Sequence, residues 1–310
     1  MTKQESTYHV PVLLREAVDA LDIRPDGTYV DVTFGGGGHS RAILEKLGPE
    51  GRLIAFDRDD DSSANVPDDP RFQLINADYR FLKNYLRLAG VRQIDGLLAD
   101  LGVSSHQFDT PSRGFSTRFE GPLDMRMDRS QKLTAAQVVN EYDEEDLARI
   151  FAQYGELRNA RQLAKAIVRY RKDKPIETTE ELIRAVEAHI PKRLRNKMLA
   201  QLFQALRIEV NGELESLKEM LRQSQELIKP GGRLAVITYH SLEDRLVKRF
   251  IQSGNFDGII EKDFYGHYSL PFKKLGKPVT PSADEIKRNP RARSAKLRVA
   301  IRTGEEKNQG

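Results

Sequence analysis

The sequence predicts an α/β fold in which a mostly parallel β-sheet is interrupted by an inserted helical subdomain. Along the first hundred residues, short β-rich apolar runs alternate with segments of helical composition, which is the pattern of a parallel sheet. More than a hundred residues with few helix breakers then separate the run ending at Asp100 from the run beginning at Arg233. A βαβ crossover is usually much shorter, so we expect an insertion between these two strands.

The strands are expected where apolar, β-branched residues cluster between turn residues. The last strand alternates polar and apolar residues, as in an edge or near-edge strand, and the fifth follows a Pro-Gly-Gly turn. The expected strands are Thr28–Phe34, Arg52–Asp57, Phe72–Ile75, Ile94–Asp100, Arg233–Thr238 and Lys296–Ile301.

Helices are expected where apolar residues recur at helical spacing. Thr178 and Glu181 have the spacing of a capping box at the start of one of them. The expected helices are Arg41–Leu47, Glu141–Ala152, Arg158–Tyr170, Thr179–Ile190 and a segment from Leu242 to Ile251, and we expect Met198–Val210 to return the chain to the sheet domain. We therefore assign 1–110 and 200–303 to the sheet domain, 111–199 to the inserted domain, and 304–310 to a loose tail.

Composition excludes several classes of protein. The 310 residues contain no cysteine, which excludes disulfides, thiolate metal sites and a cysteine nucleophile. The sequence shows neither a signal peptide nor an apolar run of about 18 residues, so we expect a soluble cytosolic protein. A net charge of +4 is too small to identify a nucleic-acid-binding protein by itself.

A glycine-rich loop, Phe34–Ser40 (FGGGGHS), lies between an expected strand and an expected helix. Four glycines let a ligand approach the backbone closely, next to the unpaired N–H groups of a helix start. A tight turn alone would need only two glycines, which favours a ligand site. The loop lacks the lysine of a phosphate-binding P-loop, and neither Gly35 nor Gly36 begins a dinucleotide fingerprint.

Three acidic residues are expected around this loop. Asp57 lies 22 residues after Gly35, where a carboxylate can accept the ribose hydroxyls of an adenosine ligand. Asp31 and Asp100 lie on two other strands, so the three acids line one crevice. This acidity disfavours a pyrophosphate and suits a ligand with a cationic amino acid or sulfonium group, such as S-adenosylmethionine. The alternative for Asp57 is a helix N-cap or a solvated turn carboxylate.

Nine sequence blocks, in this order, match those of one protein family. They begin at His9 (HVPVLL), Asp31 (DVTFGGGGHS), Ala55 (AFDRD), Asp100 (DLGVSSHQ), Arg113 (RGFS), Gly121 (GPLDMRMD), Arg207 (RIEVN), Tyr239 (YHSLEDR) and Asn289 (NPRARSAKLR). With these blocks the sequence resembles the bacterial MraW/RsmH methyltransferases over nearly its whole length. The resemblance implies a class I S-adenosylmethionine-dependent methyltransferase core, which is Rossmann-like, and methylation of N4 of a cytidine in the decoding region of 16S rRNA. It also implies the small ribosomal subunit or its 16S rRNA as partner.

The resemblance also implies which residues contact the cofactor. It places Asp57 at the ribose, Phe81 beside the adenine, and Asp100 and Gln107 near the methionine end. The remaining contacts are loop residues: Gly36, Gly37, Gly38 and His39. From their local sequence alone, Phe81 would be a core helix residue and Gln107 an ordinary loop amide.

Methyl transfer to an amine is an in-line displacement that depends largely on positioning. Many amino-methyltransferases have an Asn/Asp-Pro-Pro-aromatic motif after the fourth strand, but here that place reads Asp-Leu-Gly-Val from Asp100. We expect Asp100 to orient the reacting amine, with His240 as a further catalytic candidate beside Asp124, Asp128 and Glu243. We expect no metal, because His39, His106 and His240 stand singly in separate loops.

Local charge indicates RNA contact. Pro271–Arg302 contains ten basic and two acidic residues, and Arg158–Lys174 contains seven basic residues and one acid. Phe115, Phe119 and Tyr265 could either stack on a splayed-out base or pack in the core. The basic stretches could equally be solvated helix faces.

Two other functions remain open at this point. A nicotinamide-dependent (NAD-type) oxidoreductase would also use the glycine loop and Asp57, although the missing third glycine argues against it. A non-enzymatic RNA-binding or ribosome assembly module would leave the loop and the three acids without a purpose. The sequence fixes neither the oligomeric state, for which a homodimer is left open, nor whether free rRNA or an assembled subunit is the substrate.

Overall fold

The computed structural model describes residues 11–304, which fall into two compact units. The sheet unit comprises residues up to 102 and from 215 onward, and the helical unit comprises 103–214. The first residues and the tail after 304 expected to be loose lie outside the described residues. The helical unit extends beyond the expected insertion of 111–199 at both ends, because Val103 and Phe108 before it and the helix at 195–211 after it pack against this unit's core.

A seven-stranded sheet forms the centre of the sheet unit, in the order β3-β2-β1-β4-β5-β7-β6. β7 pairs antiparallel with β5 and β6, and every other pair is parallel, so the predicted mostly parallel Rossmann-like fold is confirmed. β6, with three residues, was not predicted because it is too short to show a period. The strands are β1 (Thr28–Asp31), β2 (Arg52–Asp57), β3 (Phe72–Asn76), β4 (Ile94–Asp100), β5 (Ile228–Thr238), β6 (Phe272–Lys274) and β7 (Lys296–Arg302).

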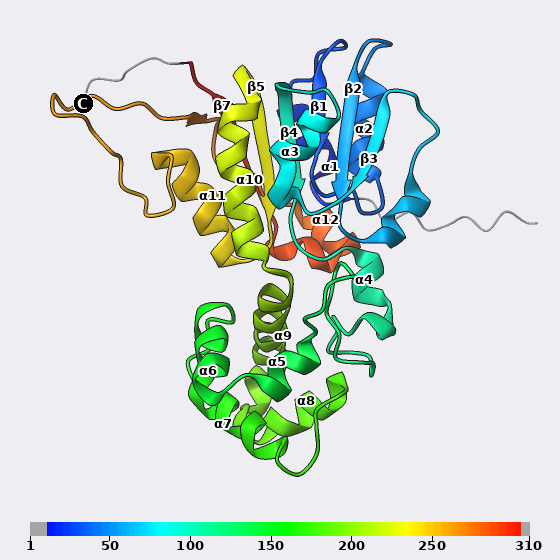
Figure 1. Cartoon of the computed structure of the whole chain (residues 1–310), viewed down its shortest axis with the longest axis vertical. Helices are drawn as coiled ribbons and strands as arrows, with labels where there is room; N and C mark the ends of the chain where they lie inside the picture. The colour runs from blue at the N-terminus through cyan, green and yellow to red at the C-terminus, as the bar shows by residue number, and fades with distance from the viewer. Residues whose placement is uncertain (1–10, 305–310) are drawn as a thin grey trace, which may run out of the picture. The chain divides into compact units, whose positions relative to one another are not determined.

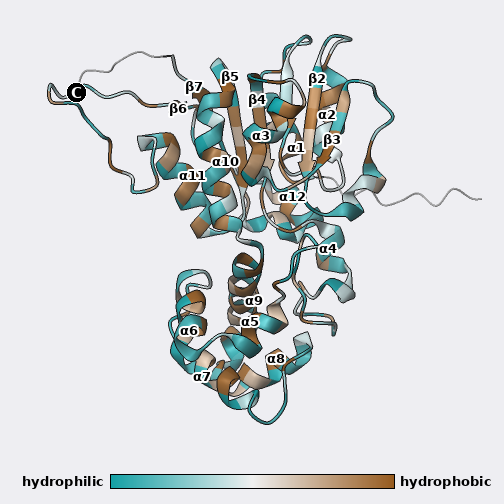
Figure 2. Ribbon diagram, in the orientation of Figure 1, coloured by the Kyte–Doolittle hydropathy of each residue, from teal (hydrophilic) through white to brown (hydrophobic). Residues whose placement is uncertain are grey.

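Helices cover both faces of this sheet (Figure 1). One face packs its aliphatic side chains against α3 (Leu82–Leu88), α10 (Glu213–Leu227) and α11 (Ser241–Ser253). The other packs against α1 (Leu14–Ala20), α2 (Gly38–Lys46) and the short helix η6 (Pro290–Ser294). Strands β2, β4 and β5 are mainly brown in Figure 2, whereas the helices alternate brown and teal, as expected when only one side of each helix is buried.

Three further short helices complete the sheet unit. They are η1 (Asp60–Asn65), η2 (Tyr79–Phe81) and α12 (Ala283–Arg288). α12 holds the start of the chain, because Glu285 Oε1 accepts a 2.8 Å hydrogen bond from the Leu13 N–H. Among the helices of residues 11–304, none is both long and apolar enough to cross a membrane.

The helical unit has its own aliphatic core, to which α5, α6, α7, α8 and α9 all contribute. The predicted capping box is present: Thr178 accepts from the Glu181 N–H, and the Glu181 side chain accepts from the Thr178 N–H. The sequence patterns missed α5, which is only two turns long. The helices are α4 (Ser105–Asp109), η3 (Pro111–Arg113), α5 (Ala135–Glu141), α6 (Glu144–Gln153), α7 (Ala160–Tyr170), α8 (Thr179–Val186), η4 (Glu187–His189), η5 (Lys192–Leu194) and α9 (Arg195–Asn211).

Asn211, at the end of α9, joins that helix to the loop before α5. Its buried side chain accepts a 2.8 Å hydrogen bond from the Met127 N–H and donates to the carbonyls of Met125 (2.8 Å) and Arg207 (2.9 Å). One amide therefore satisfies three backbone groups in the interior of the helical unit. Close by, Arg207 forms a two-pronged ion pair with Glu213, with both N–O distances at 2.8 Å.

Replacing Asn211 with Ala should lower the free energy of unfolding by about 1–3 kcal/mol, because buried backbone groups lose their partner. Gln153→Ala, at an exposed amide on α6 of the same unit, is the matched control and should change stability little. Urea denaturation followed by circular dichroism measures both. Equal stability of the two variants would show that Asn211 does not secure this loop.

Candidate functional site

The glycine loop connects β1 to α2, as the sequence predicts, but α2 begins at Gly38 rather than at Arg41. Gly37, the N-cap, has φ +72°, a conformation that side chains rarely adopt. A Cβ on Gly38 would lie 2.2 Å from Pro11 Cγ, so that position also requires glycine. Gly36 differs from both, because a Cβ there would meet no atom within 4 Å. The loop therefore presents accessible backbone at Gly36.

Asp31, the last residue of β1, fixes the glycine loop to the sheet. It is 1% exposed, and its carboxylate accepts hydrogen bonds from Ser40 Oγ (2.7 Å) and the Thr33 N–H (3.0 Å). Burial raises the pKa of Asp31, and these hydrogen bonds oppose that shift. Both carboxylate oxygens are engaged within the fold, so Asp31 supports the loop from within.

Asp57 ends β2 directly beside the glycine loop. Its two oxygens accept from the N–H groups of Gly35 (2.7 Å) and Asp59 (2.9 Å). Burial raises the pKa of Asp57 to about 6, against the lowering effect of these hydrogen bonds. The alternative in which Asp57 serves as a helix N-cap does not hold, because Asp59 caps η1.

Asp100 ends β4 and is contacted from three directions. Its N–H donates to Thr33 Oγ1 (2.6 Å), its Oδ1 accepts from the Tyr239 hydroxyl (2.8 Å), and its Oδ2 lies 3.7 Å from His39 Nδ1. Burial raises the pKa of Asp100 to about 6, although His39 and the Tyr239 hydrogen bond lower it. Asp100 is therefore a carboxylate held at a fixed position with little solvation.

Of the partners of Asp100, His39 is buried and Tyr239 is half-buried. Burial lowers the pKa of His39, and His39 Nε2 has no hydrogen-bond partner among the described residues. Burial and the Asp100 charge raise the pKa of Tyr239 well above 10, so its hydroxyl stays protonated as a donor. Sequence reasoning missed Tyr239. The available signal was its position directly after β5, at the same sheet edge as Asp57 and Asp100.

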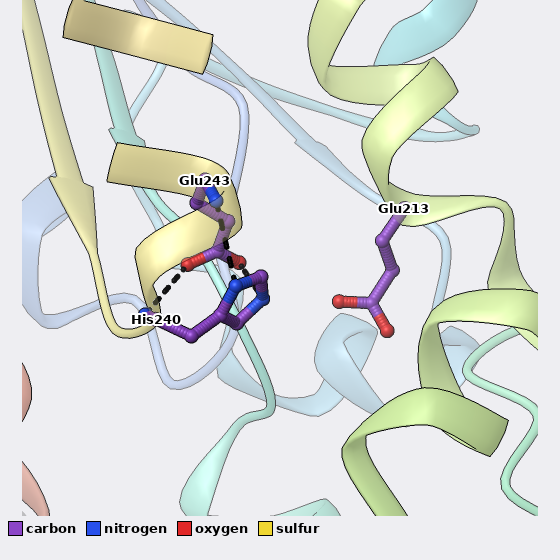
Figure 3. A group of neighbouring side chains, drawn as sticks. All are labelled: Glu213, His240 and Glu243. Atoms are coloured by element: carbon purple, nitrogen blue, oxygen red, sulfur yellow. Dashed lines mark hydrogen bonds and ion pairs between the residues drawn. The ribbon is translucent and has the colours of Figure 1, made fainter. Parts of the chain in front are cut away.

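His240 begins α11 as its N-cap (Figure 3). Its Nδ1 accepts from the Glu243 N–H at 3.4 Å, and its Nε2 lies 3.1 Å from Glu243 Oε1. The Glu243 carboxylate in turn accepts from the N–H groups of Tyr239 (2.9 Å) and His240 (3.3 Å). These contacts give His240 and Glu243 a role in fixing the turn that carries Tyr239.

Two residues implied as cofactor contacts differ from what their local sequence predicts. Phe81, at the end of η2, is 50% exposed, so the expectation of a core helix residue is wrong. Gln107 is buried in α4 of the helical unit, where it forms a capping box with Ser104. An exposed ring in the sheet unit is available to a flat ligand, whereas Gln107 has a local structural role.

The second-choice acids Asp124 and Asp128 also lie in the helical unit. Asp124 forms a two-pronged pair with Arg126 (both distances 2.8 Å), and Asp128 accepts from Ser130. Among the candidate stacking rings, Phe115 is buried in that unit's core, so stacking by Phe115 is excluded, while Phe119 and Tyr265 are exposed. In the basic stretch Arg158–Lys174, Arg171 donates to the Val139 carbonyl and Lys174 pairs with Glu181.

The sheet unit thus forms a site with accessible loop backbone, carboxylates at the ends of β2 and β4 on either side of β1, and a buried imidazole nitrogen with no hydrogen-bond partner among the described residues. These groups suit a ligand with hydroxyls and a positive charge. S-adenosylmethionine has this chemistry, so the residues present fit the expected cofactor.

Comparison with known proteins shows which family this chain is similar to. A family model described as the MraW methylase family matches residues 6–303. A ribosomal RNA small subunit methyltransferase H from Flavobacterium johnsoniae is 60% identical over 293 residues, which cover 94% of this chain and 97% of that protein. The protein of the same name from Bacteroides fragilis is 55% identical over 301 residues, covering 97% of this chain and 99% of that protein.

Replacing Tyr239 with Phe should raise the pKa of Asp100 above its value of about 6, because the carboxylate loses the hydroxyl that stabilises its charge. A carboxyl ¹³C NMR titration of the ligand-free protein measures this. Tyr85→Phe removes a hydroxyl elsewhere in the sheet unit, on α3, and should leave the Asp100 pKa unchanged. An unchanged value in Tyr239→Phe would mean that the hydroxyl does not stabilise Asp100.

Proposed function

The chain belongs to the MraW methylase family, and on that premise we propose that it transfers a methyl group from S-adenosylmethionine to N4 of a cytidine in 16S rRNA. The observation that carries this proposal is the pairing of an open glycine loop with the Asp57 and Asp100 carboxylates in the sheet unit. A nicotinamide oxidoreductase and a non-enzymatic RNA-binding module are not supported, because the relatives that match nearly the whole chain are named as methyltransferases.

The proposed cofactor contacts are those implied by the sequence. Backbone groups from Gly36 to His39 would face the cofactor, and the His39 Nε2 atom supplies a further polar contact. Asp57 would accept the ribose hydroxyls, since its carboxylate already sits beside the loop. Phe81 offers an exposed ring for the adenine, and Gln107 and Asp100 would lie near the methionine end.

The cofactor supplies an electrophilic methyl group bonded to a positively charged sulfur. Cytosine N4 is a weak nucleophile, because its lone pair is delocalised into the ring. Asp100 would accept a hydrogen bond from the N4 amino group. This contact would orient the lone pair and stabilise the positive charge that develops on nitrogen as the bond between the methyl group and sulfur breaks. Tyr239 and His39 act as positioning residues, because they hold the Asp100 carboxylate from two sides.

His240 is a weaker candidate than Asp100 for the catalytic role. Its ring caps α11 and contacts Glu243, which accounts for its burial without any contact to a reacting group. The substrate is proposed to be the small ribosomal subunit or its 16S rRNA, which places the reaction in the cytoplasm, with no membrane partner.

Asp57→Ala should abolish S-adenosylmethionine binding and with it methyl transfer, because the ribose loses its acceptor. Asp60→Ala removes a neighbouring exposed carboxylate in η1 and should leave both unchanged. The measurements are calorimetry and transfer of labelled methyl to small subunits from cells lacking this protein, with nucleoside analysis of the product. If the wild-type protein binds the cofactor but forms no N4-methylcytidine, the proposed substrate is wrong.

Asp100→Asn should slow single-turnover methyl transfer by about 100-fold with cofactor bound, because a charged acceptor is lost from the site. In the wild type the same rate should fall as the pH drops below about 6, the raised pKa of Asp100, since the acid then becomes protonated. Rapid-quench measurements from pH 5 to 8 test both. A near-normal rate in Asp100→Asn would remove Asp100 from the reaction.

A further inference from the structure

Residues 254–271 form an extended arm between α11 and β6, drawn in orange beyond α11 in Figure 1. Its first part is anchored by Phe256, whose ring stacks on Phe250 of the core (centroids 5.4 Å apart) and lies 5.1 Å from the Arg222 guanidinium. Its last part is anchored at the Pro271 carbonyl, which accepts from Thr303 and Arg302 at 3.1 Å. Helices α10 and α11 therefore hold the first end of the arm, and the end of β7 holds the last.

The tip of the arm is an ordered turn from Asp263 to His267. Asp263 Oδ1 accepts from the N–H groups of Tyr265 and His267, both at 2.9 Å. The backbone closes the same turn, because the Asp263 N–H donates to the His267 carbonyl (2.8 Å) and the Gly266 N–H donates to the Asp263 carbonyl (3.0 Å). This network fixes the backbone that carries the intervening side chains.

Two aromatic rings project from this turn without being used by the fold. Phe264 is 97% exposed and Tyr265 is 81% exposed, and their rings meet edge to face at 5.5 Å. Ile259, earlier in the arm, is also 68% exposed. Exposed apolar residues gathered on one ordered segment mark an interaction surface, since scattered single residues are the normal case.

Lysines flank these rings. Lys262 lies 5.8 Å from the Tyr268 ring, and Lys273, Lys274 and Lys277 are exposed on β6 and the turn after it. The last three lysines have no ion-pair partner within the described part of the chain. Lysine is depleted at protein–protein interfaces, whereas rings next to cations are typical of proteins that bind single-stranded nucleic acid.

We propose that the tip of the arm binds RNA, with Phe264 and Tyr265 stacking on unpaired bases and the four lysines contacting phosphates. This inference rests on the proposed function, because it assigns a second contact to the same rRNA substrate. β6 lies three strand positions from β4, which carries Asp100, or about 14 Å at the usual strand spacing. The arm therefore contacts nucleotides other than the target cytidine and contributes to affinity rather than to the chemical step.

The test is the Kd for small ribosomal subunits, measured by filter binding, of the double variant Phe264→Ala/Tyr265→Ala. Loss of base stacking should raise the Kd about 10-fold or more. Single-turnover methyl transfer at saturating subunit and S-adenosylmethionine binding should both stay within about twofold of wild type, as expected for a contact outside the reacting site. Leu88→Ala, at an 83% exposed leucine on α3, is the matched control and should leave the Kd unchanged.

A second pair of variants separates stacking from general apolar contact. Phe264→Trp/Tyr265→Phe keeps both rings and should retain the wild-type Kd, whereas Phe264→Leu/Tyr265→Leu should resemble the alanine pair. A wild-type Kd in either the alanine or the leucine pair overturns the proposal. The proposal is also overturned if sedimentation equilibrium shows a dimer for the wild type and a monomer for the alanine pair. That result would mean that the arm contacts a second copy of this chain.

The two proposals fail in distinguishable ways. If wild-type protein methylates subunits and the alanine pair binds them normally, only the assignment of the arm is wrong. If wild-type protein transfers no methyl group to subunits, the proposed function is wrong, and the comparison of Kd values still decides whether the arm binds RNA.

Discussion

Buried and half-buried carboxylates that are stabilised mainly by neutral donors are the central constraint on the sheet unit. Asp31, Asp57 and Asp100 accept hydrogen bonds from backbone N–H groups and hydroxyls, and burial raises the pKa of each. Such carboxylates destabilise a fold when they are ionised, because their hydrogen bonds within the protein replace only part of the solvation that water would give the charge. The aliphatic packing on both faces of the sheet must offset this cost, and the strand ends can then hold charges aimed at a ligand.

The two units contain different kinds of residues. The sheet unit provides the glycine loop, Asp57, Phe81, Asp100 and Tyr239 from segments that are distant in sequence but end at one edge of a parallel sheet. The helical unit is stabilised by its own core. Within it, Asn211 makes hydrogen bonds to backbone groups of the loop before α5, which lie outside any helix. Its polar residues in the blocks that carry the family resemblance, such as Asp124 and Gln107, are engaged in local pairs and caps.

Much of this structure could be predicted from sequence, because the decisive signals are local. β2 and β4 have the predicted boundaries, and the glycine loop lies where its neighbours place it. Tyr239, β6 and the exposure of Phe81 could not be predicted, because each depends on tertiary contacts. A tyrosine becomes a partner of Asp100 only when β5 lies beside β4, and three residues form a strand only when β7 offers an edge.

The antiparallel strand β7 also determines when the sheet can be completed during synthesis. β5 pairs with β4 on one side and requires β7, at Lys296–Arg302, on the other. Until that late segment leaves the ribosome, β5 has an open edge of unpaired N–H and carbonyl groups, which is a template for wrong strand pairing. Contacts of such wide sequence separation form slowly. The nascent sheet unit can therefore aggregate through the open edge of β5 until β7 pairs with it.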